Sequence, residues 1–396
     1  MLYRKRYPAP LSSLFLGGNW VFSGILSMTQ SLASATPGEY SHESSARSKL
    51  GERSPLASTS KSLKAVGSPS APPSNVQSLA VLWARKYYLS VTDETEHSTL
   101  KHPENLKQVT STQGREQTVE KLMQNLNLAS AQAWSLTETL LSAEIRRHGI
   151  NPELINPMEI AADTRFLFQK VLAAYAERST PRRLSVIVGK DFGRVRQKYT
   201  SVDRRAIGFV SMQFHYTGQK LLEWLSPAEQ TLWTPYLKVM DDHMYMPLQA
   251  AYEAAGNHPY DSPALAAVQH LLPISTKIAI SVCKQICRQY PKYRSYSGSL
   301  CESKVLTASI RDVEMFQVYL CLCVLEDDIR SVQRELFPLC VLLYPRLQVS
   351  WRLVEDMLKI LGWDMHDRLP ADDMATFLPY LRTLTDMFSA DVFNEK

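Results

Sequence analysis

The sequence predicts an all-α protein with a sizeable core. Hydrophobic residues make up 45% of the 396 residues and charged residues 21%, an ordinary balance for a chain that buries a core. The chain lacks the alternating Val, Ile and Thr runs that mark β-strands. Helical spacing of apolar residues and repeated helix-start signals occur instead.

The N-terminal segment, 1–76, is expected to be disordered. Its first 38 residues contain no acidic residue, open with Arg4-Lys5-Arg6 and hold an interrupted apolar stretch that ends near Met28. This pattern is typical of a signal or transit peptide, and an over-extended start with Met28 as the true initiator explains it equally well. The rest, 39–76, is rich in Ser, Ala, Pro and Lys and has few large apolar residues with which to form a core.

A helical N-terminal region is expected over 77–224. This region begins with a short helix and then a polar stretch to Glu116, and Ser135 resembles a capped restart within the long helical segment that follows. Proline after Asn156 and after Thr180 marks a helix start and a break. The expected helices cover 78–89, 118–148, 159–177 and 192–224.

A second helical domain is expected over 225–362, followed by a C-terminal helical extension, 363–396. Ser226-Pro227-Ala228-Glu229 has the residues of an N-terminal cap with proline in the first turn. The expected helices are 227–246, 262–272, 275–290, 309–328, 331–344, 351–361 and 369–388.

The most informative stretch begins with Arg311 and Asp312, which are expected to open a helix that becomes almost wholly apolar. Asp312, Met315, Phe316 and Tyr319 share one helical face, since residues three and four apart are neighbours. Two charges at the mouth of an aromatic-lined helix suit a ligand with polar nitrogens and a large flat apolar body. The alternative is a surface ion pair over a core helix.

This stretch resembles the phycobilisome family, the globin-like phycobiliprotein subunits of light-harvesting antennae. Their chromophore-bearing helix opens Cys-x-Arg-Asp, continues with apolar residues and closes at an acidic turn, as 309–312 and Asp327-Asp328 do here apart from the cysteine. The resemblance is clearest over 309–361 and extends over 225–362. It implies a globin-like fold for that domain, and site residues Arg311 and Asp312 for a bilin's propionate and pyrrole nitrogens.

The departure from the family is Ser309, which stands where the attachment cysteine would be. A hydroxyl is a far poorer nucleophile than a thiolate, so no covalent chromophore is expected. A bilin held non-covalently by Arg311, Asp312, Met315, Phe316 and Tyr319 and a vestigial, empty site both stay open. The resemblance implies a non-catalytic accessory or regulatory protein of the antenna or of bilin handling. The alternatives are a reversible bilin carrier and a helical nucleic-acid-binding regulator.

The resemblance also implies its partners and location. Phycobilisome or bilin-pathway proteins are the expected partners, together with a second copy of the chain. The expected location is the cytoplasm, at the cytoplasmic face of thylakoid membranes. No 18-residue apolar run predicts a membrane span.

The remaining patterns favour structural roles. The basic stretch 182–205 has only Phe192 and Tyr199 as stacking platforms, so a solvated helix face is expected rather than nucleic-acid binding. Adjacent Asp241 and Asp242 diverge on a helix and form no metal site. The chain has six cysteines without zinc-site spacing, which are expected to be structural thiols in a reducing compartment. No nucleophile elbow or phosphate-binding loop occurs, so no enzyme is predicted.

Overall fold

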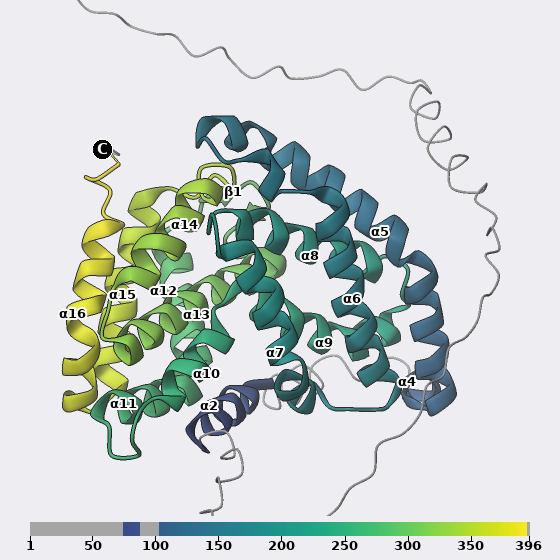
Figure 1. Cartoon of the computed structure of the whole chain (residues 1–396), viewed down its shortest axis with the longest axis horizontal. Coiled ribbons are helices and arrows are strands. Elements are labelled where there is room, and N and C mark those ends of the chain that lie inside the picture. The colour runs from purple at the N-terminus through teal and green to yellow at the C-terminus, as the bar shows by residue number, and fades with distance from the viewer. Residues whose placement is uncertain (1–73, 88–102, 394–396) are drawn as a thin grey trace, which may run out of the picture. The chain divides into compact units, whose positions relative to one another are not determined.

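The computed structural model describes residues 74–87 and 103–393, and this part of the chain is almost entirely helical (Figure 1). Its only strands form a two-residue hairpin, β1 (Arg294–Ser295) and β2 (Gly298–Ser299). The prediction of an all-α protein is confirmed. The first helices are α2 (Ser74–Ala84), α4 (Pro103–Thr110), α5 (Thr112–Arg147), α6 (Pro157–Ala176), α7 (Pro181–Thr200), α8 (Ala206–Leu222), α9 (Pro227–Tyr245) and α10 (Leu248–Gly256).

The C-terminal half is helical in the same way. It contains α11 (Pro263–Leu271), α12 (Ser275–Gln289), α13 (Ser303–Glu326), α14 (Phe337–Leu343), α15 (Trp351–Arg368) and α16 (Ala371–Met387). Three short turns complete the set: η1 (Pro152–Leu154) and η2 (Leu272–Ile274) are 3₁₀ turns, and η3 (Val332–Leu336) is a π-helical turn.

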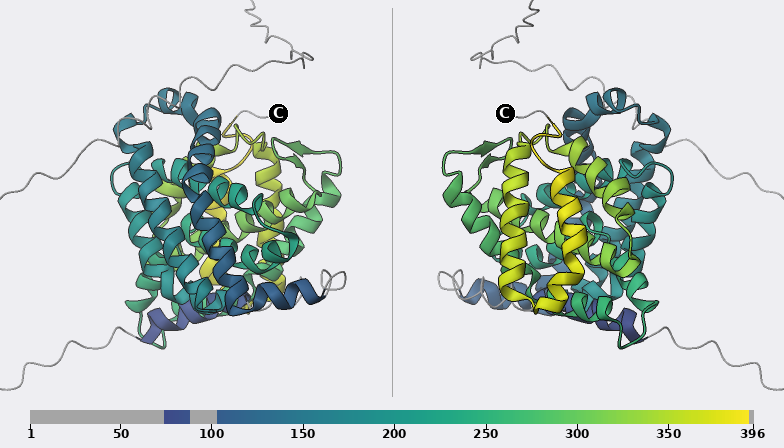
Figure 2. Two further views of the ribbon diagram at one scale, coloured as in Figure 1. Left: turned by 90° about the vertical axis from the view of Figure 1, so that its right-hand side faces the viewer. Right: turned by 90° about the vertical axis from the view of Figure 1, so that its left-hand side faces the viewer.

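Helix α13 forms the centre of the fold. Every residue from Val313 to Leu325 is buried, so this helix is covered on all sides, as an all-round apolar sequence requires. It packs against α10, α11, α12 and α16. On the other side of the molecule α5 packs along α6 and α8, while α15 and α16 lie side by side at the C-terminal edge (Figure 2).

Local capping signals set several helix starts as predicted. The Ser226 hydroxyl accepts a hydrogen bond from the Glu229 amide while the Glu229 carboxylate accepts one from the Ser226 amide, a complete capping box. Asn156 and Thr180 also cap their helices through their side chains, each with proline at the next position. These contacts span three residues or fewer, which is why the sequence alone predicts them.

Other expected boundaries were wrong. Helix α5 continues through Ser135, because the surrounding apolar face is buried against α8. Within the continuous helix the Thr137 hydroxyl donates to the Ala133 carbonyl at 2.9 Å. The expected polar stretch before residue 118 contains α4 and the start of α5, and the expected block 192–224 is two helices, α7 and α8. Helix α13 begins at Ser303, so Arg311 and Asp312 lie within it rather than at its start.

The described helices belong to one compact unit, Gly67–Lys396. The expected domain boundary at 224/225 falls inside this unit, where α9 packs against α7 and α8. The segment expected to be disordered is 1–76, and its residues 1–73 lie outside the described part of the chain. Helix α2 begins at Ser74, inside the last three residues of that segment.

One helical stretch, Pro263–Gln289, is long and apolar enough to cross a membrane by length and composition alone. It consists of α11, η2 and α12, and half of its most apolar window is buried inside the fold. Core helices pass the same test, so the stretch is weak evidence for a span.

Candidate functional site: a cationic pocket between α7, α10 and α13

The predicted pigment site is divided by the fold. Arg311, Asp312 and Met315 line a cavity of about 100 Å³ together with residues of α8, α9 and α14. Phe316 and Tyr319 do not line it. Phe316 packs edge-on against Phe388, with ring centroids 5.4 Å apart, and Tyr319 points into a different, polar network. Helical spacing alone therefore did not predict which of these side chains line the same cavity.

The charges in this small cavity lie near one another, but Nε of Arg311 and Oδ1 of Asp312 are buried without a hydrogen-bond partner among the described residues. The Arg311 guanidinium lies over the Tyr245 ring, 3.9 Å from its centroid, and 3.6 Å from carboxylate oxygens of both Asp241 and Asp312. Burial raises the pKa of Asp312 despite the opposing effect of Arg311. Ligand pockets usually measure about 300–1,000 Å³, so this cavity is too small for a tetrapyrrole without rearrangement.

Ser309 does not line the small cavity, whose α13 residues are Ala308, Arg311, Asp312 and Met315. Those four residues follow three- and four-residue spacing on one helical face, and position 309 lies about 100° around the helix from position 308. A cysteine placed at 309 would therefore not face this cavity directly.

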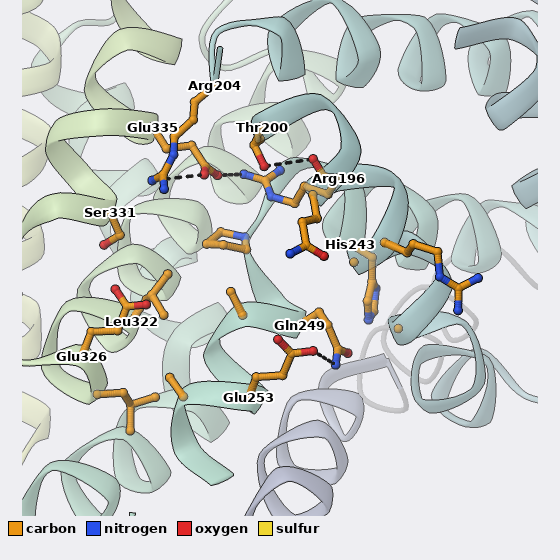
Figure 3. A pocket seen from close by; sticks show the side chains of 18 of the residues that line it. Arg196, Thr200, Arg204, His243, Gln249, Glu253, Leu322, Glu326, Ser331 and Glu335 are labelled. Carbon is orange, nitrogen blue, oxygen red and sulfur yellow. Dashed lines mark hydrogen bonds and ion pairs between the residues drawn. The ribbon is translucent and has the colours of Figure 1, made fainter. Parts of the chain in front are cut away.

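A much larger pocket, of about 950 Å³, lies nearer the C-terminal end of α13 (Figure 3). Its walls come from α7, from α10, from the C-terminal end of α13 and from η3. These elements are distant in sequence, and the pocket size falls within the range typical of small-molecule sites. It is the larger of these two pockets.

Cationic side chains dominate this pocket. Six basic residues line it against three carboxylates. The basic residues are Lys190, Arg194, Arg196, Arg204, Arg330 and Arg334, and the acidic residues are Glu253, Glu326 and Glu335. The remaining lining includes apolar atoms of Pro247, Ala250, Ala254, Leu322 and Leu325. The arrangement attracts anions and offers one apolar wall.

The pocket's cations differ in how they are compensated. Arg194 pairs with Asp191 at 3.7 Å, and Arg330 pairs with Asp328. Lys190 and Arg334 make no ion pair with any described residue. Both are exposed and therefore free to meet an anion entering from solvent.

The base of the pocket is a closed hydrogen-bond network around Arg196. Its guanidinium donates to the Glu335 carboxylate, to the Met244 carbonyl and to the Tyr319 hydroxyl, the last at 2.8 Å. Tyr319 in turn donates to Glu335 at 2.6 Å. Burial raises the pKa of Tyr319 well above its usual value, so the phenol stays a donor. In Figure 3 Glu335 lies between Arg196 and Arg204.

Two backbone features shape the pocket. Pro338 has no N–H for the carbonyl of Arg334, and the chain forms a π turn in which the Phe337 amide bonds to the Val332 carbonyl. Gly193 lets α10 approach α7, because a Cβ there would lie 2.5 Å from Cγ of Gln249. The π turn carries Arg334 and Glu335, so this irregular segment supplies both a free cation and a network member.

The predicted basic stretch 182–205 does not form one surface. Lys190, Arg194, Arg196 and Arg204 line the pocket, whereas Arg205 pairs with Asp203 at 2.6 Å. Lys198 pairs with Asp163 at 2.8 Å and with Glu159 at 3.2 Å. Arg182 and Arg183 are exposed at the start of α7. This division weakens the case for an extended nucleic-acid surface.

The other predicted clusters have structural partners. Asp241 meets His215 and Arg311, while Asp242 lies in a separate buried cluster with Lys86, Lys238 and Glu314. His215 thus pairs with the Asp241 carboxylate and also lines the small cavity. Among the described residues no group of three or more His, Cys, Asp or Glu has metal-site geometry.

His243 lines the large pocket and is buried against α7. One ring nitrogen lies 2.8 Å from the Val239 carbonyl, which fixes it as the protonated one, and the other lies 3.4 Å from the Ser185 hydroxyl. Burial lowers the pKa of His243, so the ring is neutral. Ser185 is 1% exposed and does not line the pocket, so this pair is closed to a substrate.

Sequence reasoning missed the contribution of η3 and α10 to the site. Arg330 and Arg334 are four apart, which places both on one helical face, and this spacing was the available signal. Nothing in the sequence indicated that they would meet Lys190 and Arg194 of α7.

No protein-family model, curated protein or solved structure matches this chain.

Proposed function

We propose that this protein is a non-catalytic binding protein that holds a small molecule with several negative charges in the pocket between α7, α10 and α13. The observation that carries the proposal is an excess of cations, including the unpaired Lys190 and Arg334, around a volume of about 950 Å³. Five of the six basic residues are arginines, whose planar forks suit carboxylate and phosphate groups.

The preorganised base of the pocket supports a binding role. Arg196 is already held by Glu335, Tyr319 and the Met244 carbonyl, so its charge is neutralised and its position is fixed. The exposed cations at the rim keep their charges available. An anion would therefore contact the rim first and lie against the apolar side chains of Leu322 and Leu325.

A narrower proposal follows from the phycobilisome resemblance: the ligand is a bilin, and the protein serves as an accessory or regulatory partner of antenna or bilin-pathway proteins. A bilin carries two propionates and a long apolar body, which fits a cationic pocket with one apolar wall. In this proposal the pigment occupies the large pocket, because the cavity at Arg311 and Asp312 measures only about 100 Å³. The attachment stays non-covalent.

The decisive experiment is a titration of the full chain with biliverdin, followed by absorbance, and with ATP, followed by calorimetry. The double variant Lys190→Ala/Arg334→Ala should weaken the binding of whichever probe binds by at least ~10-fold, since each charge-assisted contact contributes about 1.5–3 kcal/mol. Binding should also weaken with added salt.

The matched control is Arg182→Ala/Arg183→Ala, which removes two exposed cations of the same helix that lie outside the pocket. It should leave affinity unchanged. A second control, Asp312→Ala, alters only the small cavity and should also leave the affinity unchanged. If binding depends on Asp312 instead, the pigment lies in the small cavity, where the resemblance to the family puts it. Equal losses of affinity in the two double variants would indicate non-specific attraction of anions. No binding of either probe at millimolar concentration would contradict the proposal.

A further inference from the structure

The six cysteines fall into two groups. Cys283, Cys321, Cys323 and Cys340 are buried, as expected for structural thiols. Cys301 is exposed and Cys287 is partly buried. Cys301 is therefore the thiol that solvent reagents reach first, and Cys287 lies next to it.

Their proximity comes from the loop between α12 and α13. Cys287 lies in the last turn of α12, and Cys301 follows the hairpin β1–β2 just before α13. The Cys301 sulfur lies 3.9 Å from the Cys287 carbonyl oxygen, so the Cys301 side chain lies against the residue that carries the second thiol. The fold thus brings Cys301 into contact with Cys287 across a 14-residue separation in sequence.

We propose that Cys287 and Cys301 form a reversible intrachain disulfide that fastens the β1–β2 hairpin to α12. The thiol of Cys301 is the first to react because it is exposed, and Cys287 is the resolving thiol. Burial and the neighbouring Cys301 raise the pKa of Cys287 to about 11, which keeps it protonated and unreactive toward bulk reagents.

The reaction needs a two-electron oxidant, for which a glutathione-type disulfide is sufficient. The Cys301 thiolate attacks one sulfur of that disulfide and releases one thiolate. The Cys287 thiol gives its proton to the thiolate released in the first step and attacks the Cys301 sulfur, which forms the protein disulfide and releases the second thiolate. This second thiolate takes up the proton that Cys301 lost. Two protein thiols lose two electrons and two protons in total, and one oxidant molecule is reduced to two thiols.

The hairpin contacts a distant part of the chain, which gives the disulfide a structural consequence. The Tyr296 amide donates to the Leu347 carbonyl at 2.9 Å, and the Tyr293 hydroxyl donates to the Gln348 carbonyl at 2.8 Å. Ser297 lines the small cavity beside Arg311 and Asp312. Oxidation would therefore restrain both the α14–α15 connection and one wall of that cavity.

The test is oxidation of the full chain with glutathione disulfide, followed by alkylation and tryptic mass spectrometry. The sequence places Cys287 in the tryptic peptide 285–288 and Cys301 in the peptide 295–304, with no other cysteine in either. We expect these two peptides to be recovered linked, with four of the six thiols still free, and we expect the oxidised chain to melt at a higher temperature. Reduction by dithiothreitol should reverse both changes.

Cys301→Ser and Cys287→Ser should each abolish the linked peptides and the melting shift. The matched control Cys283→Ala, one helical turn before Cys287, should keep both. Recovery of peptide 295–304 only as a glutathione adduct or as a dimer between two chains, with Cys287 free, would overturn the proposal. A melting shift that persists in Cys301→Ser would also overturn it.

Discussion

Two groups of charged side chains in this fold differ in how their charges are balanced. In the closed cluster Lys86 and Lys238 face Asp242 and Glu314, with nitrogen–oxygen distances of 3.0–3.4 Å. The two carboxylates there have no exposed side-chain surface. The large pocket instead holds six cations against three carboxylates and is open to solvent.

The difference separates charges that hold the fold from charges that are available to a ligand. The closed cluster joins Lys86, which follows α2, to α9 and α13, and Lys86 also lies 3.5 Å from the centre of the Trp83 ring in α2. Removing one member leaves an uncompensated charge away from water, which is strongly unfavourable. Removing an exposed pocket cation leaves only solvated neighbours, so the fold should tolerate it.

The largest expected effect is on the closed cluster. Lys86→Met should lower the free energy of unfolding by about 3–5 kcal/mol, because Asp242 and Glu314 would then share only Lys238. Urea denaturation at neutral pH measures this change. The matched control is Lys190→Met in the pocket, which should change stability by less than ~0.5 kcal/mol. Equal effects of the two substitutions would refute the distinction between the clusters.

A substitution at the base of the large pocket should also destabilise the fold, but by less than a substitution in the closed cluster. Tyr319→Phe removes the hydroxyl that links Arg196 and Glu335, and it should cost about 1.5–3 kcal/mol of stability. The control is Tyr380→Phe, because Tyr380 is only partly buried and its hydroxyl donates to the Asp327 carboxylate at 2.6 Å in an exposed hydrogen bond. A cost for Tyr319→Phe no greater than for Tyr380→Phe would contradict the role of the network.

Acid pH should weaken the closed cluster selectively. Burial acts to raise the pKa of Asp242, but Lys238 and Lys86 outweigh it and lower the pKa to about 2. Since this folded value lies below the unfolded value, the contribution is present above pH ~4 and is lost as the pH falls toward 2, by on the order of 2 kcal/mol.

Urea midpoints measured from pH 5 down to pH 2 would test this. In Asp242→Asn the urea midpoint should fall less steeply between pH 5 and pH 2 than in the unaltered chain. An unchanged slope would show that other carboxylates control the acid sensitivity.

The smallest expected effect on stability comes from the rim of the pocket. Arg330→Ala/Arg334→Ala should change the free energy of unfolding by less than ~0.5 kcal/mol per site, because Arg334 has no ion pair and the Arg330 pair is exposed. The same variant should weaken binding of the anionic probe. A variant that loses stability and binding together would mean that the rim cations support the fold.

Several features were predictable because their causes are local. The Ser226–Glu229 capping box and the Asn156 and Thr180 caps depend on residues at most three apart, so sequence order already brings the partners together. The buried run of α13 was predictable for a similar reason: an all-round apolar helix is stable only when it is covered. Local signals failed at Ser135, where burial of α5 against α8 outweighed a capping pattern.

The sequence by itself thus determined the all-helical class and the main helix starts in the part of the chain that the structure describes. Only the tertiary structure decided which charges meet. Packing carried Lys86 to Asp242 and Glu314, brought α7 opposite η3 around the large pocket, and separated Met315 from Phe316 and Tyr319. Those pairings depend on which helix faces which across long sequence separations, and the three- and four-residue periodicity of a single helix does not contain that information.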